Sequence, residues 1–333
     1  MNAIDHARFR AWLRGHANIE DCAIEPVSGD ASFRRYFRVD TGGRTCILMD
    51  APPDREDSAP FVDVTRRLTA AGLNVPRVLE ADLKAGILLL DDLGDDLYLN
   101  HLHDDNAATL YRYALDALQR IQAADTTGLP DYDRTLLLRE MALFREWFLE
   151  RHLGLGPDPA RDALLNRTFE ALVEVAHEQP QVFVHRDYHA RNLMLTPDHP
   201  PGILDYQDAV HGPVTYDLVS LLKDSYIAWP RQRQLDWVFS YRDRIVEAGI
   251  IQPVDDATFL RWFDLTGVQR QLKVCGIFAR LNYRDGKPGY LRDIPLTWRN
   301  LVDAAGRYPE TRELARSLAG LDIEPGSLVD PVP

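Results

Sequence analysis

The sequence contains few cysteines and no long apolar run. Cys22, Cys46 and Cys275 are odd in number and lie far apart, which fits neither a disulfide framework nor a zinc site and favours a reducing compartment. No apolar stretch approaches the roughly 18 residues that a membrane span needs. The first ten residues carry charges and lack an apolar core, so they do not resemble a secretory signal. We therefore expect a cytoplasmic protein with no membrane partner.

Positive charge is also scarce. Lys and Arg total 38 against 51 Asp and Glu, which leaves a formal net charge of −13. A nucleic-acid backbone would be repelled by this excess, so we expect no nucleic-acid partner, whereas a cationic substrate stays compatible with it. The 45% hydrophobic and 27% charged content is typical of a globular enzyme. A chain of 333 residues is long enough for two lobes with a sizeable core.

The most informative stretch runs from residue 182 to residue 208 and reads VFVHRDYHARNLMLTPDHPPGILDYQD. Short β-type runs at 182–184, 193–195 and 203–204 are separated by a loop and by a Pro/Gly turn. Asp187, Asn192 and Asp205 thus lie at strand ends and in loops, and we expect them to face a common mouth. Phosphoryl transfer uses one carboxylate to accept a proton, and an amide oxygen with a second carboxylate to hold magnesium.

The spacing of these residues strengthens that interpretation. His185-Arg186-Asp187, four residues and Asn192 match the kinase catalytic-loop signature, with Tyr188 where the signature has leucine. Asp205 follows thirteen residues after Asn192. A lone His-x-Asp is more often a turn cap or a satisfied polar pair, but three residues in register favour phosphoryl transfer.

The segment VHRDYHARNLML, together with GILDYQDAVHGPVTYDLVSLL, resembles the aminoglycoside phosphotransferase family, the small-molecule branch of the protein-kinase-like fold. In that branch the metal-binding segment reads Ile/Leu-Asp-Trp/Tyr-x-Asp, as residues 204–208 do. The resemblance extends from SGDASFRRY near residue 28 to YRDGK near residue 287. It implies an α+β, two-lobed fold. A small β-rich nucleotide-binding lobe would span 1–94 and end in a hinge, and a larger, mainly helical catalytic lobe would span 95–333.

The resemblance also implies an activity. Within the family the chain is most similar to kinases that phosphorylate the anomeric hydroxyl of N-acetylmuramate or N-acetylglucosamine in bacterial cell-wall recycling. It implies ATP and Mg²⁺, a sugar acceptor and a monomer, with Asp187 as proton acceptor and Asn192 and Asp205 as magnesium ligands. Residues implied to border the acceptor are Tyr188, His189, Arg191 and Asp208. Asp217 and His185 are implied to brace the catalytic loop.

Two further segments are implied to contact the nucleotide. Strands are predicted at 23–27 and 36–39, and the loop between them would approach the phosphates. Its contact residues would be Gly29, Asp30, Ala31, Ser32, Phe33 and Arg34. With a single glycine, this loop taken alone would indicate an ordinary hairpin, and Asp187 downstream is what favours a phosphate loop. After an apolar strand at 86–90, the hinge residues Asp91, Asp92 and Leu93 would contact the nucleobase through their backbone.

One departure from the family pattern concerns a lysine that pairs with the nucleotide phosphates. The strand at 44–50 places Met49 where that lysine is expected, and methionine carries no charge. Either Arg34 or Arg35 reaches in instead, or magnesium carries more of the neutralisation. The helix expected at 58–71 occupies the position of the acid that pairs with the lysine. Glu56 and Asp63 lie nearby, and the sequence does not choose between them.

The rest of the chain is predicted to be helical. Apolar periodicity predicts helices at 104–124, 136–152, 160–178 and 255–281, the last with a buried stripe on one face. A second face of that last helix carries Arg270, Lys273, Arg280 and Arg284. This face is either solvated and paired with nearby acids or an anion-recognition edge, on which an arginine grips the lactyl carboxylate of N-acetylmuramate. We assign Arg270, Lys273 and Arg280 to the acceptor on the second interpretation.

Other functions remain open. An aminoglycoside or another small molecule could be the acceptor, although the basic helix face disfavours a polycation. Met49 would suit a nucleotide-binding pseudokinase, whereas a binding module has no need of a proton acceptor such as Asp187. A metal-dependent hydrolase is least favoured, because no histidine cluster has ligand spacing.

Overall fold

The computed structural model describes residues 3–27, 33–198, 200–321 and 328–329. The predicted phosphate-loop residues Gly29, Asp30, Ala31 and Ser32 lie outside the described residues. The chain packs as two compact units, of which the first comprises Met1–His101 with Asn192–Asp208 and the second Leu102–Arg191 with Ala209–Pro333. The lobe boundary expected at residues 94 and 95 remains a prediction.

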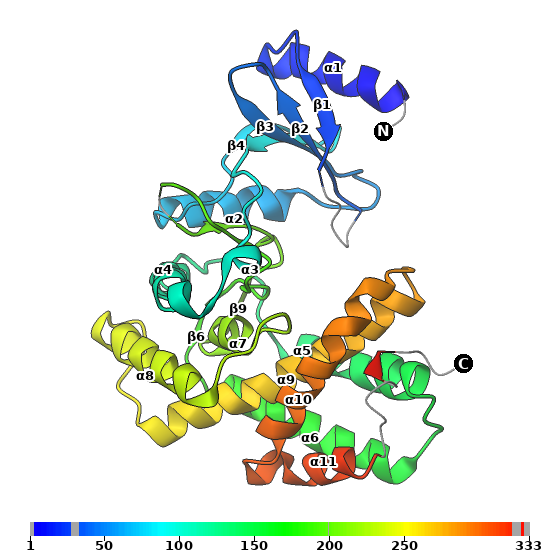
Figure 1. Cartoon of the computed structure of the whole chain (residues 1–333), viewed down its shortest axis with the longest axis vertical. Coiled ribbons are helices and arrows are strands. Elements are labelled where there is room, and N and C mark those ends of the chain that lie inside the picture. The colour runs from blue at the N-terminus through cyan, green and yellow to red at the C-terminus, as the bar shows by residue number, and fades with distance from the viewer. Residues whose placement is uncertain (1–2, 28–32, 199, 322–327, 330–333) are drawn as a thin grey trace. The chain divides into compact units, whose positions relative to one another are not determined.

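The first unit is built on an antiparallel five-stranded sheet in the order β1-β2-β3-β5-β4 (Figure 1). Its strands are β1 (Ala23–Pro26), β2 (Arg35–Asp40), β3 (Thr45–Asp50), β4 (Val78–Asp82) and β5 (Ile87–Asp91). The helix α1 (Ala3–Ala17) packs on one face of this sheet. In β5 every residue from Ile87 to Leu90 is buried, as its unbroken apolar run predicts.

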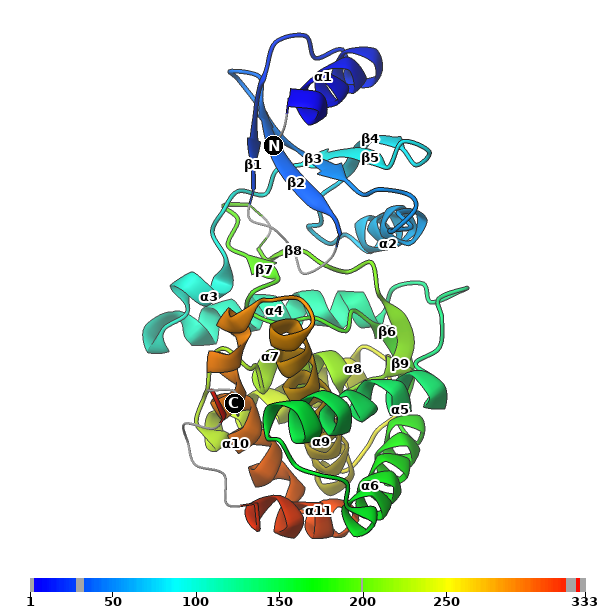
Figure 2. The same ribbon diagram turned by 90° about the vertical axis from the view of Figure 1, so that its right-hand side faces the viewer.

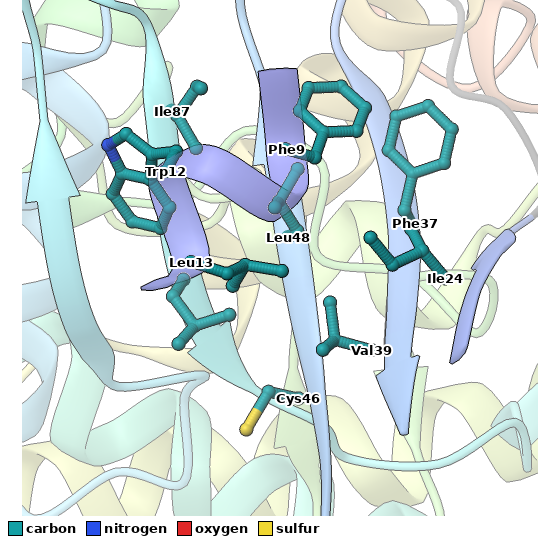
Figure 3. Packing of buried hydrophobic residues seen from close by; sticks show 10 residues of the cluster. Phe9, Trp12, Leu13, Ile24, Phe37, Val39, Cys46, Leu48 and Ile87 are labelled. Atoms are coloured by element: carbon teal, nitrogen blue, oxygen red, sulfur yellow. The ribbon is translucent and has the colours of Figure 1, made fainter. Parts of the chain in front are cut away.

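The core of this unit lies between α1 and the sheet (Figure 3). Phe9, Trp12 and Leu13 project from the helix at a spacing of three and four residues, so they share one face. The ring of Phe9 lies 5.0 Å from the ring of Phe37 in β2, and Leu48 of β3 is fully buried beside them. Each such burial contributes about 1.5–3 kcal/mol.

The helix α2 (Ala59–Ala70) joins the sheet to the segment 192–208. It buries Phe61, Val64 and Leu68, as the sequence predicts, and Gly72 follows it with a φ of +73°. In the segment 192–208, β7 (Leu193–Met194) pairs with β8 (Gly202–Ile203). Tyr206 then stacks on Phe61 at 5.2 Å, which ties this segment to α2.

The second unit is mainly helical around the long helix α9 (Asp256–Tyr283), which packs against the helices on several sides of it (Figure 2). Its other helices include α4 (Asp104–Gln122), α5 (Arg134–Leu143), α6 (Pro159–His177), α7 (Tyr216–Leu222), α8 (Arg231–Glu247), α10 (Ile294–Ala305) and α11 (Pro309–Ala319). A short 3-10 helix, η2 (Pro288–Asp293), also packs on α9. A two-stranded ribbon of β6 (Gln181–Val184) and β9 (Val210–Pro213) carries the catalytic loop.

One predicted helix differs from the structure. The single helix expected at 136–152 is α-helical only to Leu143 and continues as a π-helix, η1 (Phe144–His152). The change falls where α9 passes closest, because a Cβ placed on Gly276 would lie 2.4 Å from the carbonyl carbon of Leu143. Apolar periodicity does not report such a change in winding.

Within the described ranges, no helix combines the length and the apolar character that crossing a membrane requires.

Candidate active site

The catalytic loop in the second unit is held by a buried aspartate. Asp217 of α7 accepts hydrogen bonds from the backbone N–H groups of His185 and Arg186, at 2.7 and 2.9 Å. Arg186 has a φ of +77°, a left-handed conformation that costs free energy and is often found at functional sites. The backbone N–H of Asp187 donates to Nδ1 of His185 at 3.3 Å. Asp217 and His185 therefore brace this loop, as the resemblance implies.

Asp187 is half-buried among positive charges. Burial by itself would raise the pKa of Asp187, but the nearby positive charges outweigh it, first that of Lys273 and, among the arginines, those of Arg186 and Arg270. They hold the pKa of Asp187 at about 2. Its carboxylate is therefore ionised and able to accept a proton.

A buried acid fixes two of these cations. Glu140 of α5 bonds with Arg186 and with the hydroxyl of Tyr132, and its Oε1 lies 3.1 Å from Nζ of Lys273. Burial tends to raise the pKa of Glu140, but Lys273 and Arg186 lower it overall. Lys273 also donates to the hydroxyl of Tyr216 at 3.1 Å. Lys273 is thus a buried, paired residue, which corrects its assignment to the acceptor.

Arg270 is likewise buried, with 3% of its surface exposed. Its charge lowers the pKa of Asp187 and opposes the burial that raises the pKa of Asp217 and Asp224. The interpretation of this helix face as a solvated one is therefore wrong for Arg270 and Lys273. Their charges act on the acids of the catalytic loop instead.

Arg280 differs from its neighbours on the same helix face. It is half-buried, no ion pair joins it to any described residue, and its buried Nε has no hydrogen-bond partner among them. Burial lowers the pKa of Arg280. One turn further on, Arg284 is exposed and its Nε donates to Asp285 at 2.8 Å. Arg280 is therefore the member of the predicted anion-recognition edge whose donors remain available.

The two residues that follow Asp187 in the sequence have different surroundings. Tyr188 is fully buried, and its hydroxyl donates to the carbonyl of Ala114 at 2.8 Å, so it belongs to the core rather than to an acceptor surface. Burial lowers the pKa of His189 to about 3, and the imidazole is therefore neutral. Its Nδ1 has no hydrogen-bond partner among the described residues.

The predicted magnesium ligands lie in the first unit. The side-chain amide nitrogen of Asn192 lies 3.3 Å from Oδ2 of Asp205, and Gln207 donates to Oδ1 of Asp205 at 2.7 Å. Asp205 has a φ of +62°. Among the described residues no group of three or more His, Cys, Asp or Glu side chains could hold a metal. One carboxylate with neutral amides fits Mg²⁺, which keeps several waters and completes its shell with substrate phosphates. Asp208 is exposed.

The strand that lacks the lysine has an arginine nearby. Met49 is fully buried in β3. Arg34 is 8% exposed, and its guanidinium lies 3.2 Å from Oε2 of Glu56, whose Oε1 accepts the backbone N–H of Phe33 at 3.1 Å. Arg35 pairs instead with Asp50. Of the two candidate acids, Glu56 and Asp63, it is therefore Glu56 that forms an ion pair with Arg34.

The side chains of the predicted hinge are engaged in ion pairs. Asp91 bonds with Arg77, and Asp92 accepts from Nε of Arg38 at 2.6 Å. Leu93 lies beside Gly202. The contact of this backbone with a nucleobase remains a prediction.

Some residues of this site were missed from the sequence. Glu140 is an acid on the same helix face as Leu137 and Met141, both buried, and that placement was an available signal of a buried ion pair. Asp224 accepts the backbone N–H of Ala190 at 3.0 Å, for which the sequence offers no local signal.

An antiparallel sheet unit, a helical unit and a braced His-Arg-Asp loop define a protein-kinase-like phosphotransferase. Residues 23–248 match the phosphotransferase enzyme family, and the chain belongs to it. Among solved structures, an ethanolamine kinase from Plasmodium vivax aligns with a TM-score of 0.66 at 9% identity. This alignment covers 94% of this chain and 92% of that one.

Relatives of known name match nearly the whole chain. An N-acetylmuramate/N-acetylglucosamine kinase from Pseudomonas aeruginosa is 48% identical over 331 residues, covering 95% of this chain and 98% of that protein. A protein of the same name from Pseudomonas putida is 45% identical over 319 residues, covering 95% and 92% respectively.

Proposed function

We propose that this protein is an ATP-dependent kinase that phosphorylates the anomeric hydroxyl of N-acetylmuramate or N-acetylglucosamine, as a step in peptidoglycan recycling. The observation that carries the proposal is the His-Arg-Asp loop that presents Asp187, because Asp217 braces it through the backbone N–H groups of His185 and Arg186. Support for the acceptor comes from the names of the two Pseudomonas relatives, which match almost the full length of the chain.

Asp187 would act on the acceptor hydroxyl. In phosphoryl transfer the transition state is loose, so the proton leaves the attacking hydroxyl late and the base chiefly orients it. The cations around Asp187 lower its pKa, so the carboxylate is ionised before the reaction and can accept the proton. His189, a neutral imidazole, would hydrogen-bond a sugar hydroxyl rather than exchange a proton.

Asn192 and Asp205 would hold Mg²⁺. The donor set of one carboxylate and one amide fits this ion. When bound, magnesium supplies positive charge to the nucleotide phosphates. Gln207, bonded to Asp205, would keep that carboxylate oriented.

Arg34 would take the place of the absent lysine, with Glu56 as its acid partner. A guanidinium is always charged and grips phosphate oxygens in pairs. The loop residues 29–33 would contribute backbone N–H groups, and Asp91, Asp92 and Leu93 would present their backbone to the nucleobase. We further propose that the enzyme is a cytoplasmic bacterial monomer. We also propose that it has no nucleic-acid partner, since its net charge of −13 would repel a phosphate backbone.

The test is a coupled assay of ADP release with ATP and magnesium over a panel of N-acetylmuramate, N-acetylglucosamine, glucose, kanamycin and choline. Loss of the reducing end is followed in parallel. We expect turnover of the two N-acetylated sugars with their reducing ends blocked. Turnover of kanamycin or choline alone would refute the acceptor, and the absence of turnover with ATP still bound would favour a pseudokinase.

A further inference from the structure

An arginine of the catalytic loop lies over two tyrosine rings of the second unit. The guanidinium carbon of Arg191 lies 4.1 Å from the ring centre of Tyr226 and 5.8 Å from that of Tyr290. Tyr226 follows α7, and Tyr290 belongs to η2. Arg191, Tyr226 and Tyr290, which come from three separate segments, form an aromatic clamp. Stacking of this kind orients a guanidinium, because its planar faces are used and its N–H edges point outward.

The clamp is braced against the loop that carries Asp187. Asp224 accepts the backbone N–H groups of both Ala190 and Tyr226, each at 3.0 Å. The imidazole of His189 meets the ring of Tyr226 edge-on at 5.5 Å. The ring centre of Phe278 in α9 lies 6.1 Å from that of Tyr226 and 5.6 Å from that of Tyr290, so Phe278 packs against both rings. These contacts hold the two rings, and with them the guanidinium of Arg191, next to the catalytic loop.

A second stacked arginine in the same unit shows what a structural clamp looks like. The guanidinium of Arg233 lies 4.8 Å from the ring of Trp229 and 5.3 Å from that of Trp237. Its N–H edge is used, because Nη1 donates to Asp104 at 2.9 Å. Arg191 is half-buried, and no acid among the described residues lies within ion-pair distance of it. Apart from an interaction with the side chain of Tyr226, the N–H groups of Arg191 are available to a ligand.

The chemistry next to Arg191 limits what that ligand is. Asp293, at the end of η2, has a buried Oδ2 without a hydrogen-bond partner among the described residues, while its Oδ1 lies 3.9 Å from Arg292. Asp293 follows Tyr290 by three residues, one turn of the 3-10 helix η2, so the two side chains share the face on which Arg191 lies over Tyr290. Burial raises the pKa of Asp293, and the charge of Arg191 opposes that rise. A carboxylate or phosphate ligand would be repelled by this acid. A neutral group with one acceptor and one N–H would satisfy both residues.

We infer that Arg191 and Asp293 recognise the acetamido group of the acceptor sugar, with Tyr226 and Tyr290 packing against its methyl group. The guanidinium would donate to the acetamido carbonyl, and the free oxygen of Asp293 would accept its N–H. This inference rests on the proposed function, since both proposed acceptors carry an acetamido group. These four residues would then determine specificity by binding the acetamido group of the sugar, and they would bind neither the phosphates nor the lactyl carboxylate.

The test compares N-acetylglucosamine with glucose, which lacks the acetamido group. In Arg191→Lys, which keeps the charge but loses the planar fork, we expect the ratio of kcat/KM for the two sugars to fall about 10- to 100-fold, through KM for N-acetylglucosamine. Asp293→Asn should lower the same ratio. If glucose turns over too slowly, its inhibition constant against N-acetylglucosamine replaces its kcat/KM. Arg233→Lys is the matched control, and its ratio should stay at the wild-type value.

Each other outcome overturns the inference. Equal losses for both sugars would mean that the clamp only supports the fold, a rise in KM for ATP would mean that Arg191 binds the nucleotide, and a loss confined to N-acetylmuramate would mean that it binds the carboxylate. An unchanged ratio in both variants, with wild-type melting temperatures, would exclude acetamido recognition. If the wild-type enzyme phosphorylates neither amino sugar, the proposed function has failed instead.

Discussion

At the residue scale, the ionisation of Asp187 depends on charges that are themselves buried. Lys273 lowers the pKa of Asp187 more than any other single group does. Lys273 remains charged because Glu140 raises its pKa against the effect of burial. Glu140 therefore keeps Lys273 charged, and Lys273 in turn lowers the pKa of Asp187. Of these three residues, only Asp187 touches substrate in the proposed reaction.

Replacing Lys273 should therefore change the pH dependence of the reaction. In Lys273→Met we expect the pKa of Asp187 to rise by about 1–3 units, because burial is then less strongly opposed. Activity needs the ionised form, so kcat/KM is lost as the pH falls through this pKa. Between pH 7.5 and pH 4.5 the variant should lose up to about fourfold, whereas the wild-type pKa of about 2 causes no loss there. The measurement is a pH profile of kcat/KM.

Lys223→Met supplies the control for that profile. Lys223 is also buried, and its Nζ donates to Asp264 at 2.7 Å, but its charge is not one of the main charges that lower the pKa of Asp187. This variant should lose stability with no displacement of the acid limb. Superimposable profiles for Lys273→Met and the wild type would show that Lys273 does not lower the pKa of Asp187 enough to affect activity above pH 4.5.

Arg280 yields a prediction about the choice between the two sugars. A charged hydrogen bond contributes about 1.5–3 kcal/mol, so Arg280→Met should lower kcat/KM for N-acetylmuramate about 10- to 100-fold. N-acetylglucosamine has no carboxylate and should lose no more than about twofold, as expected where no charged hydrogen bond is removed. Steady-state kinetics with both sugars decides the matter. Arg284→Met, on the same helix face but paired with Asp285, should alter neither value. Equal losses in Arg280→Met would exclude a carboxylate contact.

At the element scale, the sequence predicts most of the strands and helices that carry the site. The apolar run before Asp91, the helix over Phe61 to Leu68 and the short strands on either side of Asn192 all occur close to their expected positions. These elements follow from local periodicity and from turn residues. The match to the phosphotransferase enzyme family confirms the predicted protein-kinase-like fold and family. The sequence could predict both because the His-Arg-Asp loop is a local motif.

Other features depend on contacts between distant segments, and periodicity does not contain them. The face of α9 with Arg270 and Lys273 looks polar in the sequence, yet both residues are buried, because Glu140 and the acids of the catalytic loop face them. The rings of Tyr226 and Tyr290 meet at Arg191 from segments more than sixty residues apart in the chain. Only the folded chain brings such residues together.

The π-helical winding of η1 leads to a prediction about Gly276. A Cβ at this position would lie 2.4 Å from the carbonyl carbon of Leu143 and 2.6 Å from the backbone nitrogen of Phe144. Backbone atoms cannot rotate away, so Gly276→Ala should destabilise the protein by about 3 kcal/mol, at the upper end for overpacking. The apparent melting temperature would report this loss.

The control is a glycine in a helix without such a neighbour. A Cβ at Gly15 in α1 would meet nothing within 4 Å, so Gly15→Ala should stabilise the protein by up to about 1 kcal/mol through helix propensity. A wild-type melting temperature in Gly276→Ala would show that α9 and η1 can separate at no cost.

At the scale of the whole molecule, the proposed base and the proposed metal ligands belong to different compact units. Asp187 belongs to the second unit, while Asn192 and Asp205 belong to the first, to which the segment 192–208 returns. Only four residues therefore separate the proposed base from the first proposed metal ligand along the chain. Binding of magnesium nucleotide and acceptance of the proton should then be separable by substitution.

Thermal stability measured with and without magnesium and ATP tests this separation. A ligand at about 100 times its Kd stabilises the native state by about 2.7 kcal/mol, so the wild-type protein should melt at a higher temperature with both present. Asp187→Asn should keep this gain while its kcat falls by about 10²- to 10⁴-fold, as loss of a general base typically causes. Asp205→Asn should lose the magnesium-dependent part of the gain, as the wild type does in chelator. If Asp187→Asn also loses the gain, Asp187 contributes to nucleotide binding, and the two functions are not divided between the units as proposed.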